Sequence, residues 1–357
     1  MTQYPLRVHS GLDTKHHKGY IENLLDLGAP IELMPMDAFT GMTTDARRDF
    51  NRLRAKAITR GIMVRSDSFL NLQEVLIGVM RQHQFREGGG HGVMVSADSY
   101  TGKTTAARIL MLDVVKQGIF EDPESVSRGD VLVSYVNLPS TGTPLGLYRM
   151  LAYYYGLPIG ARETEATMEG MVQHAINVCN TQLVVIDDVH NLKYGGAHSR
   201  KVSAAIRRLG DDINCPILLM GVALERTNLL TGQEGAQIFE RYRPAEMASY
   251  LSIKRPDDKQ RWLRLVKSII GAMPLFADNT QGLRAFASEL HSLTGGRIGP
   301  LNSIISRVAL DLIEADDPEN ETIRVQLAET KADELAHEDR IKAAIAGRSG
   351  KRARGAA

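Results

Sequence analysis

The segment from Val93 to Thr105 constrains the fold of this chain more than any other, because it carries most of a phosphate-binding loop. Gly102, Lys103 and Thr104 fill the last three positions of the pattern G-x-x-x-x-G-K-[ST], and Ala97 stands where the pattern has its first glycine. In such loops, backbone N–H groups at a helix N-terminus bind phosphate, the lysine reaches the β- and γ-phosphates, and the hydroxyl reaches Mg²⁺. The segment therefore predicts a strand, a loop and a helix that bind a nucleoside triphosphate.

The predicted nucleotide contacts form one continuous stretch. They are Asp98, Ser99, Tyr100, Thr101, Gly102, Lys103, Thr104 and Thr105. Ala97 adds only one methyl group, which the loop tolerates if φ stays negative at that residue. ATP and Mg²⁺ are the cofactors that this pattern predicts.

A second apolar run ends in two acidic residues. Residues 183–186 (LVVI) predict a strand buried on both faces, and Asp187 and Asp188 follow it. We expect Asp187 to face the loop and to hold Mg²⁺ together with Thr104, because parallel strands bring their carboxyl ends to one edge of a sheet. Asp188 stands where a carboxylate could polarise the attacking water. The alternative, a helix N-cap and a solvated loop acid, is less favoured after so apolar a strand.

Strand patterns alternate with helical patterns through the middle of the chain. Apolar runs at 130–138 and 217–220 predict further strands, so we expect an α/β fold with a parallel sheet flanked by helices. After residue 256 only helical patterns occur, which predicts a small all-α lid domain. The predicted domains are an N-terminal arm that could contact a partner (1–45), the nucleotide-binding α/β domain (46–255), the helical lid (256–335) and a basic, flexible tail (336–357).

Composition places the chain among ordinary globular proteins. Of its 357 residues, 43% are apolar and 24% are charged, with a net charge of +1. Cys179 and Cys215 lack metal-binding spacing and lie in apolar stretches, so we expect reduced core cysteines. The N-terminus lacks the apolar core of a signal peptide, and no run reaches the roughly 18 apolar residues of a membrane span. We therefore expect a cytoplasmic protein without a membrane partner.

Three arginines are candidates for completing the site. Arg297 precedes a helix in a Gly-rich turn, from which a cation could reach bound phosphates; a turn arginine in water is the alternative. Arg241 and Arg243 could each supply a guanidinium to a neighbouring subunit's site. A surface salt bridge is almost as plausible for either of them, and the sequence does not distinguish the two.

Two groups of basic residues are candidates for contact with DNA. The first lies on and before the helix that follows the acidic strand: Lys193, Arg200, Lys201, Arg207 and Arg208, with His190, Asn191 and His198 among them. The second is the run of Lys and Arg from Arg340 to Arg354. Such residues could follow a phosphate backbone without reading bases. A solvated helix face is slightly favoured for the first group, and a solvated tail is equally favoured for the second.

The order and spacing of five motifs resemble those of the AAA+ ATPases of the TniB/TnsC type, transposition regulators akin to the Mu phage B protein. The motifs occupy residues 98–105, 183–192, 217–222, 239–244 and 294–299, and the resemblance runs from about residue 60 to about residue 315. The family commonly reads D-E-[IV]-H-N-L after the acidic strand, and here Asp188 replaces the glutamate. This departure and Ala97 leave the rate of hydrolysis open.

The resemblance implies that ATP-bound subunits assemble as rings or filaments on double-stranded DNA, recruit a DDE-type transposase and mark the target site. Lys103, Thr104, Asp187 and Asp188 would then carry the nucleotide and magnesium chemistry, and hydrolysis would disassemble the oligomer. Gly221 stands where related ATPases often place a polar first sensor, so that role is unassigned. Two alternatives stay open: an AAA+ helicase loader or replication initiator, and a weakly hydrolysing, nucleotide-gated scaffold.

Overall fold

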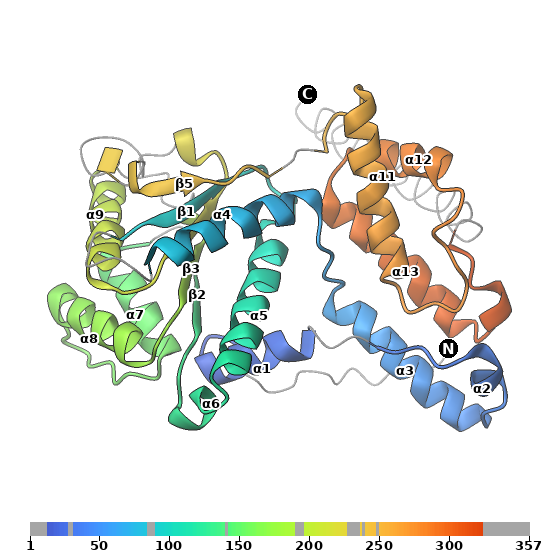
Figure 1. Ribbon diagram of the computed structural model, residues 1–357, viewed down its shortest axis with the longest axis horizontal. Helices are drawn as coiled ribbons and strands as arrows, with labels where there is room; N and C mark the ends of the chain where they lie inside the picture. The colour runs from blue at the N-terminus through green and yellow to red at the C-terminus, as the bar shows by residue number, and fades with distance from the viewer. Residues whose placement is uncertain are drawn as a thin grey trace, which may run out of the picture. The chain divides into compact units, whose positions relative to one another are not determined.

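The chain forms two compact units, and both are discontinuous in sequence. The computed structural model describes residues 13–27, 31–83, 90–139, 142–189, 196–226, 236–237, 240–247 and 250–323. The first unit combines residues 1–29 with 65–252, and the second combines residues 30–64 with 253–357. Figure 1 shows the helices and strands of each unit.

The first unit is built on a parallel sheet of five strands in the order β2-β3-β4-β1-β5. The strands are β1 (Gly92–Ser96), β2 (Val133–Asn137), β3 (Leu183–Asp187), β4 (Ile217–Gly221) and β5 (Tyr242–Pro244). Every residue of β3 and β4 is buried, which explains why both read as continuous apolar runs. The predicted parallel α/β sheet is confirmed. The short strand β5, which contains a proline at the sheet edge, was not predicted.

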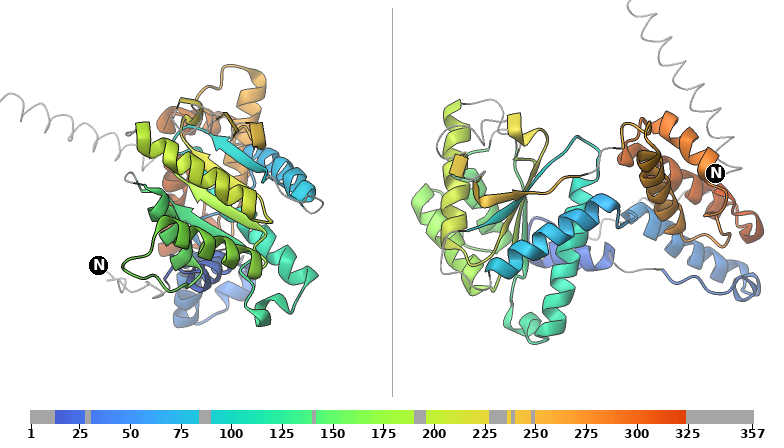
Figure 2. Two further views of the ribbon diagram at one scale, coloured as in Figure 1. Left: turned by 90° about the vertical axis from the view of Figure 1, so that its left-hand side faces the viewer. Right: turned by 45° about the horizontal axis from the view of Figure 1, so that its top comes forward.

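Helices cover both faces of this sheet (Figure 2). One layer contains α7 (Pro144–Tyr154), α8 (Glu165–Val178) and α9 (Gly196–Asp212), which pack on one another. The other layer contains α1 (His17–Leu27), α4 (Asp67–His83) and α5 (Lys103–Glu121), with the short α6 (Ser125–Arg128) after it. A 3₁₀ turn, η2 (Leu224–Arg226), follows β4. Because β1 leads directly into α5, the sheet places the intervening loop at the carboxyl edge of the strands.

Local capping explains where two of these helices begin. The Thr143 side chain accepts a hydrogen bond from the Gly146 N–H at the start of α7, and Pro144 occupies the first helical turn, where its missing N–H costs nothing. Thr164 caps α8 in the same way. The two cysteines are free; Cys215 is buried as predicted, and burial raises the pKa of its thiol to about 12, whereas Cys179 is only half-buried.

The second unit is entirely helical over its described residues. It contains α2 (Met36–Thr40), α3 (Thr44–Arg60), α11 (Pro256–Gly271), α12 (Arg284–Thr294), α13 (Ile298–Glu314) and the 3₁₀ turn η4 (Pro318–Asn320). Trp262, Leu290 and Ile305 are among its core side chains, each nearly or fully inaccessible to solvent. The structure thus confirms the all-α pattern predicted after residue 256.

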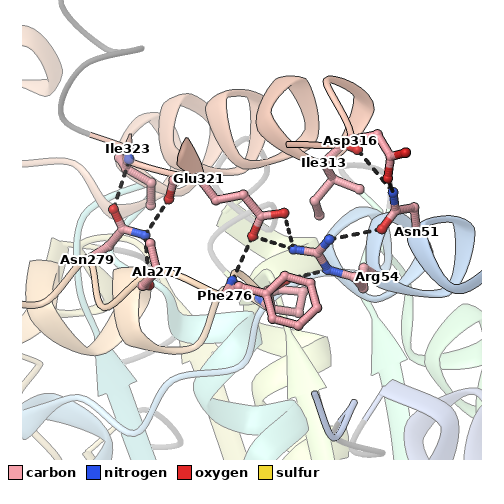
Figure 3. A network of polar contacts seen from close by, with 10 residues as sticks. Asn51, Arg54, Phe276, Ala277, Asn279, Ile313, Asp316, Glu321 and Ile323 are labelled. Atoms are coloured by element: carbon pink, nitrogen blue, oxygen red, sulfur yellow. Dashed lines mark hydrogen bonds and ion pairs between the residues drawn. The ribbon is translucent and has the colours of Figure 1, made fainter. Parts of the chain in front are cut away.

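Residues 46–64 fall in the helical unit, which differs from the predicted domain boundary at residue 46. Arg54 of α3 explains the assignment, because its guanidinium pairs with both carboxylate oxygens of Glu321 at 2.6 and 2.7 Å and both side chains are 1% exposed (Figure 3). Arg54 also donates to the Pro274 carbonyl and to Asn51. The packing partner of α3 lies far along the chain, which no local pattern reveals.

No helix among the described residues is both long enough and apolar enough to cross a membrane.

Candidate nucleotide-binding site

The loop between β1 and α5 has the backbone that a phosphate-binding loop requires. Gly102 immediately precedes α5 with φ 87°, in the left-handed region where glycine carries no steric penalty. Ala97 stays out of the positive-φ region, which is the condition under which alanine fits the first position, and its N–H donates to the Gly221 carbonyl at 3.1 Å. Tyr100 has φ 64° and is 65% exposed at the loop. Asp98 and Ser99 are exposed beside it.

Lys103, the first residue of α5, lies folded back across the loop. Its ammonium donates to the carbonyls of Ala97 at 2.8 Å and Asp98 at 2.7 Å, and the residue is only 8% exposed. Burial lowers the pKa of this ammonium, while the carboxylates of Asp187 and Asp188 act in the opposite direction. The charge is therefore held at the centre of the loop by neutral carbonyl oxygens, which a phosphate oxygen can replace with a stronger, charge-assisted hydrogen bond.

Asp187, the last residue of β3, is fully buried and receives three hydrogen bonds. Its Oδ2 accepts from Thr104 Oγ1 at 2.8 Å and from Tyr135 Oη at 3.1 Å, and its Oδ1 accepts from the Asp188 N–H at 2.8 Å. Burial raises the pKa of the Asp187 carboxyl, and the hydrogen bonds from Thr104 and Asp188 partly offset that rise. Thr104 and Asp187, which the sequence predicted as a metal-binding pair, thus lie in direct contact. A hydroxyl and a carboxylate are oxygen ligands of the kind that Mg²⁺ takes.

Asp188 lies at the same carboxyl edge of the sheet as Asp187, but its backbone conformation and its hydrogen-bond partner differ. Its φ of 56° is a left-handed conformation, which aspartate tolerates better than most residues. Asn137, the last residue of β2, donates from Nδ2 to Asp188 Oδ2 at 2.7 Å. One oxygen of the predicted water-polarising carboxylate is therefore engaged by a neighbouring strand.

Three further side chains at this edge were not predicted. Tyr135 and Asn137 come from β2, and Ser96 Oγ at the end of β1 donates to Glu225 Oε2 at 2.6 Å. Ser96 Oγ also accepts from the Leu224 N–H at 2.9 Å, so it fixes the turn that follows β4. A hydroxyl or an amide inside an apolar strand carries no motif. Ser96 adjoins the loop in the sequence, whereas only the sheet order brings Tyr135 and Asn137 to the acidic pair.

The predicted arginines have different surroundings. Arg241 forms an ion pair with Asp211 at the end of α9, and Asp211 also accepts from Arg207 at 3.1 Å. Arg243 lies in the edge strand β5 with an exposed side chain. Arg297 is exposed at the start of α13, in the helical unit. Arg241 and Arg243 thus belong to the same unit as the loop, and Arg297 belongs to the helical unit.

The predicted DNA-contact residues are only partly described. Lys201 is exposed on α9, but Arg208 pairs with Glu165 at 2.9 Å and Glu169 at 2.8 Å, and Arg207 pairs with Asp211. His190, Asn191, Lys193 and the basic residues after residue 323 lie outside the described residues, as do the side chains of His198 and Arg200. Arg207 and Arg208 are therefore already neutralised by carboxylates of the same unit.

A family model for the bacterial TniB protein matches residues 54–251, more than half of the chain. The chain belongs to the TniB family. The matched span of this TniB family member contains the loop, the acidic pair, Arg241 and Arg243, but not Arg297. Together with the sheet order and the phosphate-binding loop, family membership assigns the chain to the AAA+ class of nucleotide-binding proteins.

No curated protein matches this TniB family member. Among solved structures, the Aeropyrum pernix ORC1 protein in complex with DNA is 12% identical, with 78% of this chain and 67% of that chain covered and a TM-score of 0.44. The Aeropyrum pernix ORC2 protein in ADPNP–ADP complexes is 13% identical, with 76% of this chain and 69% of that chain covered and a TM-score of 0.48. Drosophila ORC bound to AT-rich DNA and Cdc6 is 9% identical, with 88% of this chain and 44% of that chain covered and a TM-score of 0.45. These likenesses are too distant to transfer a function.

Proposed function

We propose that this TniB family member is an ATP-dependent, DNA-binding ATPase that assembles on double-stranded DNA and recruits or stimulates a DDE-type transposase at the target site. The observation that supports the nucleotide chemistry best is the 2.8 Å hydrogen bond from the Thr104 hydroxyl to the buried Asp187 carboxylate. Thr104 directly follows Lys103 in the loop motif. The DNA and transposase parts of the proposal are supported by the family assignment.

The geometry of the loop supports the proposed nucleotide binding. The β- and γ-phosphates of ATP replace the carbonyls of Ala97 and Asp98 as acceptors for the Lys103 ammonium. The N–H groups at the start of α5 face the phosphates, because the first turn of a helix leaves them without partners. Thr104 and Asp187 would hold Mg²⁺, which would neutralise charge on the phosphates.

Asp188 is the residue that we propose to polarise the attacking water. Asn137 donates to Asp188 Oδ2 and so restrains the orientation of the carboxylate that would accept a hydrogen bond from water. We therefore expect slow hydrolysis by the isolated chain and faster hydrolysis in an assembly that separates Asn137 from Asp188. A chain that never separates them would act as a nucleotide-gated scaffold, the second candidate that this contact favours.

A neighbouring subunit would complete the site with a guanidinium. Arg243 is exposed and ready to make such a contact, whereas Arg241 must first exchange its Asp211 partner. Both stay candidates for the role in trans, and we propose Arg297 as a lid cation that responds to bound phosphates. Hydrolysis by the Arg241→Ala and Arg243→Ala variants, alone and mixed with Lys103→Ala subunits, separates the two. The variant of the trans-acting arginine should lose hydrolysis alone and regain it on mixing, because the Lys103→Ala subunit supplies that arginine to a site with an intact lysine.

Imaging of the purified protein with duplex DNA tests the proposal. We expect rings or filaments on DNA with ATP or a slowly hydrolysed analogue, and none with ADP. Lys103→Ala should abolish the assemblies, and Lys116→Ala, a substitution of another lysine on α5, should leave them intact. Assemblies that form equally well with ADP, or monomers under every condition, would contradict the proposal. Assembly without phosphate release above the Lys103→Ala background would favour the scaffold.

A further inference from the structure

Helix α1 is part of the nucleotide-binding unit rather than a free N-terminal arm. Tyr20 and Leu24 on this helix are 6% and 1% exposed. His17 Nδ1 lies 3.0 Å from the Tyr154 carbonyl, and Asp13, just before the helix, accepts a hydrogen bond from Tyr153. The helix is thus fixed at both its start and its middle to elements that surround β2.

Tyr20 connects this helix to β2. Its ring stacks on the ring of Tyr135, with centroids 5.2 Å apart and an interplanar angle of 14°. The ring of Tyr154 packs against it edge to face, with centroids 5.9 Å apart, and the Tyr20 hydroxyl donates to the sulfur of Met111 on α5 at 3.7 Å. Contacts on several sides hold the Tyr20 ring in place, and the stacked ring of Tyr135 is restricted with it.

Tyr135 connects the stacked rings to the acidic residues at the carboxyl edge of the sheet. Its hydroxyl donates to Asp187 Oδ2, the same oxygen that accepts the Thr104 hydroxyl. The two donors differ in freedom, because the Thr104 hydroxyl sits on a short side chain, whereas the Tyr135 hydroxyl moves only with its whole ring. The orientation of the Asp187 carboxylate is therefore linked to the position of the Tyr135 ring, and through it to Tyr20.

We propose that Tyr135 is a positioning residue for Asp187 and that the Tyr20–Tyr135 stack couples helix α1 to occupancy of the metal–nucleotide site. The inference rests on the proposed role of Asp187 as a metal-binding carboxylate. A ligand that binds at Oδ2 competes with the two hydroxyl donors for the same lone pairs. When Mg²⁺ and nucleotide occupy the site, the hydrogen bond from Tyr135 changes, the ring follows, and the packing of Tyr20 and its helix changes with it.

A purely structural role for the Tyr135 hydroxyl predicts something different. In that case it would only satisfy a buried carboxylate oxygen, so removing it would lower stability without altering how α1 responds to the nucleotide. The discriminating observable is the response of residues 17–27 to Mg²⁺ and nucleotide. This response is measured on a helix whose residues are not among the predicted nucleotide contacts.

Hydrogen exchange of the full-length chain, read by mass spectrometry over residues 17–27, tests the coupling. We expect Mg²⁺ with a slowly hydrolysed ATP analogue to change exchange in this segment several-fold relative to the same nucleotide with a metal chelator. Tyr135→Phe keeps the ring stack but removes the hydroxyl; it should abolish the change and raise the Mg²⁺ concentration needed for tight nucleotide binding several-fold. Tyr153→Phe is the matched control, because it removes a tyrosine hydroxyl that contacts the α1 region without touching Asp187, and it should keep the response.

Tyr20→Leu provides a second route that leaves Tyr135 and Asp187 intact. It should weaken the response of residues 17–27, while Tyr20→Phe, which keeps the stacked ring, should preserve it. If the wild-type chain binds the Mg²⁺–nucleotide complex normally but its hydrogen exchange over residues 17–27 does not change, the inference is overturned and the proposed function stands. The same conclusion would follow if Tyr135→Phe showed the same exchange response as the wild-type chain. Failure of the wild-type chain to bind the complex at all would overturn the proposed function together with this inference.

Discussion

Each unit of the molecule buries a carboxylate, but the two carboxylates are neutralised to different degrees. In the helical unit, both carboxylate oxygens of Glu321 accept hydrogen bonds from the guanidinium of Arg54, and one of them also accepts from the Phe276 N–H at 2.7 Å. In the nucleotide-binding unit, Asp187 receives only neutral donors, and among the described residues no ion pair includes it. The first network is electrostatically complete. The second leaves a buried negative charge that a bound cation would compensate.

The difference separates a structural contact from a functional one. A buried charge persists only when it is paired or when its site has another use for it. The Lys103 ammonium, the nearest functional cation, is held by the loop carbonyls of Ala97 and Asp98 rather than by Asp187. We interpret the incomplete neutralisation of Asp187 as the feature that prepares this edge of the sheet for Mg²⁺.

The largest expected effect comes from breaking the complete network. Arg54→Met should lower the free energy of unfolding by about 3–5 kcal/mol, because it leaves the Glu321 carboxylate buried without its partner. Urea denaturation measures the change. The matched control is Arg52→Met on the same helix, since the Arg52–Asp49 pair is exposed and such pairs contribute about 0–1 kcal/mol. Equal losses in the two variants would contradict the structural role assigned to Arg54.

The next effect concerns the cation that the loop supplies. Lys103→Ala should weaken ATP binding by about one to two orders of magnitude, since a charge-assisted hydrogen bond to phosphate contributes roughly 1.5–3 kcal/mol. Titration with a fluorescent ATP analogue measures the affinity. The free energy of unfolding should change little, because the ammonium contacts only two carbonyls of its own loop. If Lys103→Ala lowered the free energy of unfolding as much as Arg54→Met does, the distinction between a functional charge in one unit and a structural charge in the other would be wrong.

A smaller effect should follow from releasing Asp188. Asn137→Ala removes the amide that engages Asp188 Oδ2 and should raise hydrolysis without DNA by up to about tenfold, a change of roughly 1.4 kcal/mol in the barrier. Phosphate release at saturating ATP is the measurement. Gln173→Ala is a suitable control, because that amide binds Asp212 instead. Unchanged or slower hydrolysis in Asn137→Ala would show that Asn137 does not restrain Asp188.

The smallest effect tests the incomplete neutralisation itself. Because burial raises the pKa of Asp187 above its usual value, the folded state binds a proton more readily than the unfolded state, so stability falls as pH rises through the folded-state pKa. Asp187→Asn lacks this loss and should be more stable than wild type at neutral pH, on the order of 1 kcal/mol. The stability advantage of Asp187→Asn over the wild-type chain should shrink as the pH falls below the usual carboxyl pKa. Thermal unfolding at several pH values checks the sign, and a less stable Asp187→Asn at neutral pH would contradict it.

Sequence reasoning found the parts of the site that have a local pattern. The strands β3 and β4 are apolar on both faces and therefore read clearly, and the loop motif placed Thr104 and Lys103. The contact of Thr104 with Asp187 followed from the rule that parallel strands share a carboxyl edge. The roles assigned to the arginines stay predictions.

The missed features depend on contacts between distant segments. Tyr135 was counted among the apolar residues of its strand, and nothing local shows that its hydroxyl reaches Asp187 on the neighbouring strand. Arg54 reads as one more polar residue on a charged helix, although it is fully buried against Glu321. Burial of a charged side chain becomes visible only when its partner is known, and here the partner lies 267 residues away.

That separation sets the order in which the chain can mature during synthesis. Arg54 leaves the ribosome early, and the whole sheet, ending with β5 at Pro244, follows before Glu321 is made. The nucleotide-binding unit can thus complete its sheet while α3 still lacks its partner, because contacts of high sequence separation form last. A chain truncated before Glu321 would keep every strand of the sheet but leave the Arg54 guanidinium without this carboxylate, so the core of the second unit can close only after translation has passed residue 321.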